Sequence, residues 1–216
     1  MNNISEDSLI WSTLDAKPLV PNDWDFFWNA WNKFAGPSYL VKTDPAGNRL
    51  SETSKNKEFF QGLNIYADDP KLLVDNHWSL PFLDYKEIFP NILEDISLTI
   101  PWAKIHHLRL WNSTIPIPFH RDHASEPIAL RSMIYDENKT PTFKVFHDKA
   151  GVSYVNLPSE TNWFVYNNKK CLHGSNKFEG VKKIILLIIH TVKDKTLFLD
   201  HLKSSAQKYP DHQKYF

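Results

Sequence analysis

Two side chains that can bind a metal ion stand two residues apart, at His120 and Asp122. In an extended segment, residues i and i+2 point to the same face, so the imidazole and the carboxylate would be aimed at one point. A third candidate, His173, lies further along the chain, in a turn-like stretch just before a strongly β-forming run. Two histidines and one carboxylate can cover one face of an octahedral metal ion and leave three adjacent positions open. The spacing therefore predicts a metal centre, and the catalytic residues, at His120, Asp122 and His173.

A His-x-Asp triplet also arises by chance, and this chain has 10 histidines. Three features favour a metal site here. Apolar β-forming segments flank the triplet, the distal histidine lies between two expected strands, and a basic residue, Lys183, follows it. A two-histidine, one-carboxylate site with open positions is typical of non-haem Fe(II) oxygenases, so Fe(II) is the metal we expect.

The composition is that of an ordinary globular protein. The 216 residues are 42% hydrophobic and 23% charged, and 25 basic side chains balance 25 acidic ones. Without a basic excess, nucleic acid is not expected as an obligatory partner. The single cysteine, Cys171, excludes an intrachain disulfide and fits a reducing compartment. We see no signal peptide and no membrane-spanning run, so we expect a cytoplasmic protein with no membrane partner; the oligomeric state is left open.

The first hundred residues predict mainly helices. An aromatic stripe at three- and four-residue steps indicates a helix that ends before Gly36-Pro37. A second, short helix is expected around 55–61, and a third over 85–98 with Pro90 in its first turns. Residues 1–20 show no clear periodicity.

From residue 101 the pattern changes to short β-forming runs separated by turn signals. The expected strands cover 105–111, 130–135, 142–147, 152–157, 163–166 and 183–192. This predicts an α+β protein with a double-stranded β-helix core, a cupin-like jelly roll, over 101–195. The helical part, 1–100, would pack on that core, and 196–216 would form a C-terminal helix and tail. We expect a single domain over 1–216.

The β-rich part resembles the Fe(II)/2-oxoglutarate-dependent dioxygenases, and within them aspartyl/asparaginyl β-hydroxylase-like and phage-type members. The runs that carry the resemblance are Arg109–Ser113, His120–Asp122, Leu130–Met133, Trp163–Asn168, His173–Asn176 and Val181–Ile184. The resemblance implies that 2-oxoglutarate and O₂ are co-substrates and that the protein hydroxylates an unactivated C–H bond. The substrate would be an amino-acid-like small molecule or a side chain of a peptide or protein.

The sequence departs from these relatives where the far carboxylate of 2-oxoglutarate would be held. Where the relatives have an arginine after the distal histidine, this chain has Lys183, and the second position of their Arg-x-His pair is Met133. The resemblance then implies Arg131 as the main anchor, because its planar fork can bind a carboxylate through two hydrogen bonds. Lys183 would support it, and Asn112 could hydrogen-bond the co-substrate.

Two other interpretations remain open at this point. One is a cupin-type metal protein, such as an isomerase or a sugar-binding module, that shares the barrel without using 2-oxoglutarate. The other is a non-catalytic relative that has kept only the fold. Substrate-independent turnover of 2-oxoglutarate to succinate would separate the dioxygenase from both.

Overall fold

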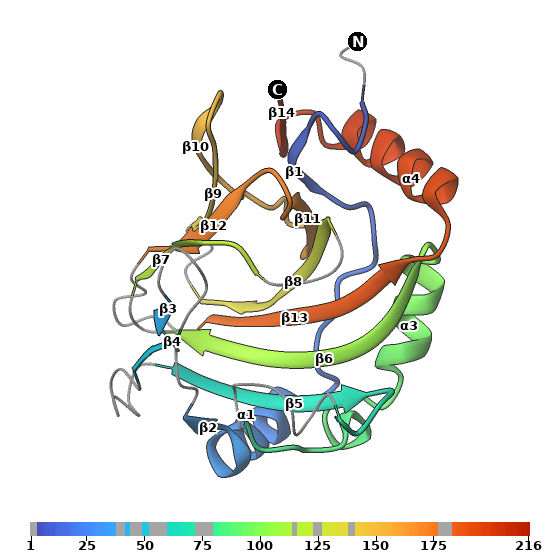
Figure 1. Ribbon diagram of the computed structural model, residues 1–216. Helices are drawn as coiled ribbons and strands as arrows, with labels where there is room; N and C mark the ends of the chain where they lie inside the picture. Colours follow the sequence, from blue (N-terminus) through green and yellow to red (C-terminus); the bar gives the residue numbers. More distant parts are fainter. Residues whose placement is uncertain are drawn as a thin grey trace.

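The computed structural model describes residues 4–37, 42–43, 49–51, 60–71, 80–113, 116–122, 127–137, 141–176 and 183–216. Within these ranges the protein is built mainly from antiparallel strands, arranged as an eight-stranded sheet, a four-stranded sheet and a two-stranded ribbon. The ribbon joins β3 (Lys42–Thr43) to β4 (Arg49–Ser51). Figure 1 shows the four-stranded sheet on one side of the curved eight-stranded sheet.

The eight-stranded sheet takes strands from both halves of the chain. In spatial order it contains β14 (Gln213–Tyr215), β1 (Leu9–Thr13), β11 (Trp163–Asn167), β8 (Ile128–Asp136), β13 (Lys183–Val192), β6 (Ala103–Ser113), β5 (Phe60–Ala67) and β2 (Gly36–Pro37). The four-stranded sheet runs β10 (Gly151–Tyr154), β9 (Phe143–His147), β12 (Leu172–Ser175) and β7 (Ile117–His120).

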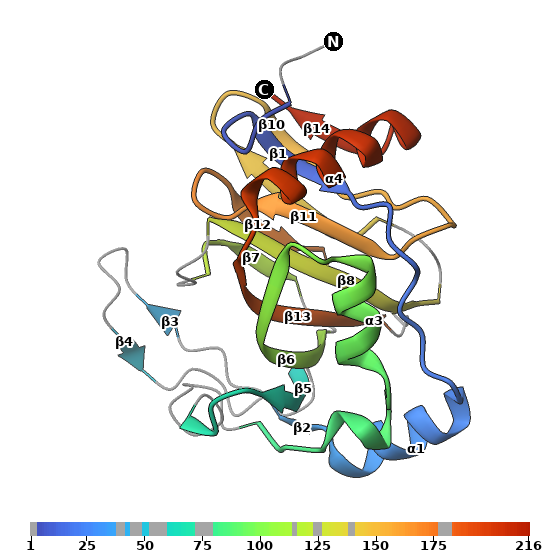
Figure 2. The same ribbon diagram turned by 90° about the vertical axis from the view of Figure 1, so that its right-hand side faces the viewer.

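The two faces of the eight-stranded sheet bury different partners. On the outer face, alternate residues such as Leu130 and Leu186 join one apolar core with the helices α1 (Trp24–Phe34), α3 (Ile92–Thr99) and α4 (Lys195–Lys208). On the inner face, Phe164 and Ile185 pack with Phe143 of the four-stranded sheet in a second core. Figure 2 is turned so that α3 and α4 lie in front of the strands. The inner face is therefore the surface that can present side chains to the four-stranded sheet.

The strand at 183–192 is central, as its aliphatic run predicts. β13 lies between β8 and β6 and pairs with both along most of its length. Its side chains are buried from Lys183 to Leu186 and again at Ile188, whereas Ile189 is 41% exposed. Because it faces a core on each side, its sequence shows no alternation of polar and apolar residues. One end of the inner face is thus closed and the other opens toward solvent.

The expectation of an α+β protein with a mainly helical first half packed on a jelly roll is wrong. The described part of that half contains the helices α1 and α3, but β1 and β5 belong to the large sheet. All five residues of β1 are buried, so this strand has no alternating pattern for a sequence reading to detect. Most of the helix expected at 55–61 lies outside the described residues, and its last two positions begin β5.

The other expected helices form with small changes. At the start of α1, the Asp23 carboxylate accepts a hydrogen bond from the Phe26 amide, and Trp24 packs edge-on against Tyr135 of β8. The helix expected over 85–98 forms as two pieces, the 3₁₀ turn η1 (Tyr85–Glu87) and then α3. Pro90 separates them, since proline has no amide hydrogen to donate in a continuing helix. At the C-terminus β14 pairs with β1, so the last strand of the chain lies beside the first (Figure 1).

Candidate metal centre

Two strands of the four-stranded sheet bring the histidines together. His120 ends β7 and is the direct cross-strand partner of His173 in β12. Gly174 allows this pairing, because a Cβ at that position would lie 2.6 Å from the Ile117 carbonyl oxygen and 3.1 Å from that of Pro118. Any side chain here would push the two strands apart. The sequence His173-Gly174 thus combines a ligand with the residue that permits its approach.

The three predicted ligands converge on one point. Their ligating atoms all lie within 4.8 Å of one another. Oδ1 of Asp122 is 3.6 Å from Nε2 of His120 and 3.5 Å from Nε2 of His173, and the two rings are 4.2 Å apart between centroids. Neighbouring ligands at about 2.1 Å from an octahedral ion are about 3 Å apart. The cluster is therefore close to the spacing that one metal ion with adjacent ligands requires.

The hydrogen bond of His120 presents the correct nitrogen to a metal. Nδ1 of His120 lies 2.9 Å from the Pro118 carbonyl oxygen, which can only accept, so Nδ1 must carry the proton. Nε2 then keeps its lone pair and faces Asp122. His173 is packed between the rings of Phe143 and Tyr166, and its Nδ1 has no hydrogen-bond partner within the described residues. One ligand is oriented by a hydrogen bond and the other by packing.

Asp122 uses its two oxygens differently. Oδ1 faces the histidines, whereas Oδ2 accepts a 2.6 Å charge-assisted hydrogen bond from Nη2 of Arg131 and a long one, 3.5 Å, from the Tyr166 hydroxyl. The Asn168 side chain makes two hydrogen bonds with the backbone of Asp122: its Oδ1 accepts from the Asp122 amide, and its Nδ2 donates to the Asp122 carbonyl. The carboxylate is consequently fixed, with one oxygen left to bind a metal.

Two of the three groups are shifted toward the form that binds a metal, and His120 is not. Burial by itself would raise the pKa of Asp122, but the two histidines and Arg131 outweigh it and hold this pKa well below its usual value. Burial lowers the pKa of His173, and Asp122 offsets only part of that effect. Burial lowers the pKa of His120, but the nearby Asp122 carboxylate and the Pro118 carbonyl outweigh it and raise the pKa, so a metal ion competes with a proton for Nε2. A charged carboxylate and a neutral His173 are the forms that bind a metal.

The predicted co-substrate residues lie in three different places. Arg131 is at the cluster, but its guanidinium is engaged by Asp122 and by the carbonyl oxygens of Leu130 and Ile188. Lys183 is fully buried at the closed end of the inner face, where its Nζ contacts Asp136 at 2.9 Å and Thr142 at 3.3 Å.

Asn112 is on β6, where alternate residues face opposite sides of the sheet. It shares its side with Leu108 and Leu110, which belong to the outer core, and not with Arg109. The structure therefore brings Arg131 to the three ligands, places Lys183 further along the inner face, and turns Asn112 away.

Several residues were not predicted from the sequence to contact the metal ligands. Tyr166 and Asn168 contact Asp122 from β11 and the turn after it, and the register between distant strands that places them is not visible in the sequence. Burial raises the pKa of the Tyr166 phenol, so it stays protonated and can donate. Arg109 is a third such residue: the charges of Asp122 and Arg131 both act on it. The sequence could have shown that Arg109 faces inward, because residues 109 and 111 alternate with the apolar residues 108 and 110, which face the outer core.

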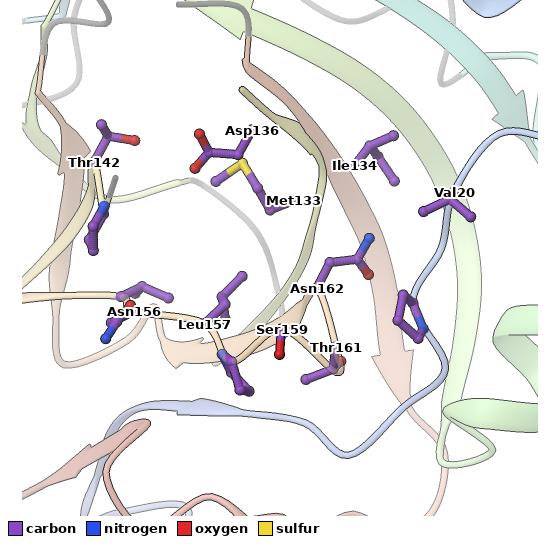
Figure 3. A pocket seen from close by; sticks show the side chains of 14 residues that line it. Val20, Met133, Ile134, Asp136, Thr142, Asn156, Leu157, Ser159, Thr161 and Asn162 are labelled. Atoms are coloured by element: carbon purple, nitrogen blue, oxygen red, sulfur yellow. The ribbon is translucent and has the colours of Figure 1, made fainter. Parts of the chain in front are cut away.

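Figure 3 shows a separate hollow of about 270 Å³. Its wall includes Met133 and Asp136 of β8, with Thr142, Leu157 and Asn162 around them. None of the three metal-ligand candidates lines it. Asp136 and Thr142, the residues that contact Lys183, form part of this wall, so the hollow adjoins the closed end of the inner face.

A scan against protein-family models and a search of curated proteins found no match to this chain. No helix within the described residues is both long and apolar enough to cross a membrane.

Proposed function

We propose that this protein is a mononuclear Fe(II)- and 2-oxoglutarate-dependent dioxygenase that hydroxylates an unactivated C–H bond. The observation that carries the proposal is the convergence of His120, Asp122 and His173, with their ligating atoms within 4.8 Å. One carboxylate and two imidazoles on one side of a metal suit Fe(II) and leave positions for a chelating co-substrate and for O₂. When bound, the iron and 2-oxoglutarate would supply the oxidative chemistry.

The protein's own part is to hold and orient the ligands. The Pro118 carbonyl fixes the protonation of His120, and Arg131 holds Oδ2 of Asp122 away from the histidines. Phe143 and Tyr166 cover the ring of His173, whose side chain is only 7% exposed. His120 and Asp122 are more open, at 39% and 34%. A substrate would therefore approach from the side of His120 and Asp122.

The far carboxylate of 2-oxoglutarate is better matched by Lys183 than by Arg131. Arg131 is paired with Asp122 and Lys183 with Asp136, but Lys183 lies deeper on the inner face and has the Thr142 hydroxyl beside it. The Thr142 hydroxyl accepts a hydrogen bond from Lys183, and the backbone carbonyl of Thr142 accepts one from the amide of Asn176. Beside Asn176, the buried Ser175 hydroxyl has no hydrogen-bond partner within the described residues. The Lys183 ammonium and the Thr142 hydroxyl are groups that can bind a buried carboxylate, which would share the lysine with Asp136.

The test of this function combines metal binding with turnover. The purified protein should bind one Fe(II) per chain without O₂ and, on aeration, convert 2-oxoglutarate to succinate. The variant His173→Ala should lose both, while His212→Ala, which removes a histidine bonded to the Asn156 carbonyl on the surface, should keep both. Stoichiometric iron binding without succinate formation would contradict the dioxygenase and favour a metal protein of another class. A cytoplasmic location belongs to the same proposal, because Cys171, the single cysteine, is a free thiol.

A further inference from the structure

A second arginine lies level with the metal site on the inner face of the large sheet. Leu187 of β13 is the direct cross-strand partner of Arg109 on one side and of Arg131 on the other. Direct partners in antiparallel strands point to the same face. Arg109 and Arg131 therefore stand in one row across three strands, and Arg131 is the residue that contacts Asp122.

Arg109 is held in place from the neighbouring strand. Its Nε donates to Oδ1 of Asn64 at 3.1 Å, and Nε2 of His107 contacts the same oxygen at 3.0 Å. Asn64 is fully buried, and its amide group donates to the Leu80 carbonyl, which fixes its orientation. An arginine whose Nε is fixed in this way has an oriented guanidinium, so less entropy is lost when it binds a planar anion.

The depth of Arg109 separates it from the proposed co-substrate residues. Along β13 the inner-face side chains run from Lys183, 1% exposed, through Leu187 to Ile189, 41% exposed. Arg109 pairs with Leu187, four residues from Lys183, which is about 13 Å along a strand. It thus lies toward the open end, where the substrate would enter, and not at the closed end with Lys183.

We propose that Arg109 is a substrate-recognition residue of this site and that the substrate carries a carboxylate which this guanidinium binds. The inference rests on the proposed function for the metal beside it. Asp122 balances the charge of Arg131 at the cluster, and Arg109 brings a further positive charge to the same row. Burial lowers the pKa of Arg109 to about 10, so it remains charged at neutral pH. A carboxylate matches both that charge and the geometry of the fork.

The test uses a pair of probes that differ in one group. The protein is loaded with Mn(II) in place of iron, O₂ is excluded, 2-oxoglutarate is present at saturation, and the relaxation of the probe's protons reports binding near the metal. The probes are succinate and succinamate, in which an amide replaces one carboxylate. We expect the parent protein to bind succinate at least tenfold more tightly than succinamate. Arg109→Met should abolish that preference, whereas Lys104→Met, which removes an exposed cation from the same strand, should retain it.

A second variant covers the case in which Arg109→Met does not fold. Asn64→Asp keeps Arg109 and the side-chain shape but places a negative charge next to Nε, so it should also reduce the succinate preference at least tenfold. The proposal is overturned if the parent binds both probes equally, or if the Arg109 and Asn64 variants retain the preference. The same probes are followed by chemical shifts in the metal-free protein, so that a protein that binds no Mn(II) refutes the metal centre while the role of Arg109 is still read independently.

Discussion

At the scale of single residues, the metal site depends on how Asp122 divides its two oxygens. Oδ2 accepts from Arg131 at 2.6 Å, and this contact keeps Oδ1 directed at the two histidines. A carboxylate without that restraint could rotate or bind the metal through both oxygens. Residues that orient metal ligands are usually worth a factor of about 10 to 100 in metal affinity.

The variant Arg131→Met should therefore bind Fe(II) about 10 to 100 times more weakly than the parent, because Asp122 loses its charged partner. The measurement is an anaerobic Fe(II) titration at neutral pH, with circular dichroism to show that the fold is kept. Lys104→Met serves as the control for loss of a positive charge. An unchanged iron affinity in Arg131→Met would mean that this contact does not position the ligand.

At the scale of elements, the pairing of β7 with β12 decides whether the histidines meet. Gly174 lies where a Cβ would come within 2.6 Å of a backbone oxygen of β7, and backbone cannot move aside as a flexible side chain can. The carbonyl of Pro118, which is also close to that Cβ, is the one that holds His120. A side chain at position 174 would therefore displace the Pro118 carbonyl that orients His120.

Gly174→Ala should destabilise the protein by about 1–3 kcal/mol and weaken iron binding, since the two strands must separate. Gly62→Ala is the matched control, because a Cβ at Gly62 would meet the end of the Leu80 side chain at 2.7 Å, away from the triad. Urea unfolding and an iron titration of both variants would check this. If Gly174→Ala bound iron as tightly as the parent and Gly62→Ala do, our account of the β7–β12 contact would be wrong.

The sequence predicted elements well where their signal was local. The aromatic stripe of α1 and the strand at 183–192 each depend on short-range spacing, and each is found where expected. β1 and β5 were missed because their partners are distant: β1 pairs with β11, and β5 with β6. The same limit applies to Arg131. The alternation along β8 could predict which face of the sheet Arg131 lies on. Its contact with Asp122 could not be predicted, because it depends on how the eight-stranded and four-stranded sheets pack against each other.

At the scale of the whole molecule, two buried histidines make stability depend on pH. His107 and His190 are 1% and 3% exposed, and burial lowers the pKa of each to about 4. In the unfolded chain each would titrate near its ordinary value of about 6.5. The folded state therefore favours the neutral forms, and their contribution is complete above pH 6.5 and lost as the pH falls toward 4.

His190→Gln should reduce this acid sensitivity. A pKa change of this size corresponds to at most about 3 kcal/mol for one histidine, so the parent should lose more stability between pH 7 and pH 4.5 than the variant does. Urea unfolding at the two pH values gives the difference. His212→Ala, which removes a histidine at the surface, is the control and should match the parent's loss. Equal losses in the parent and in His190→Gln would show that His190 does not contribute.

The central claim is that His120, Asp122 and His173 hold one iron ion, and anomalous X-ray diffraction tests it most directly. Crystals prepared without O₂ in the presence of Fe(II) would be measured on both sides of the iron absorption edge. Our account predicts a single anomalous peak per chain, within about 2.0–2.3 Å of Nε2 of His120, Nε2 of His173 and Oδ1 of Asp122. A peak bound by other residues, or no peak in crystals that contain Fe(II), would contradict it.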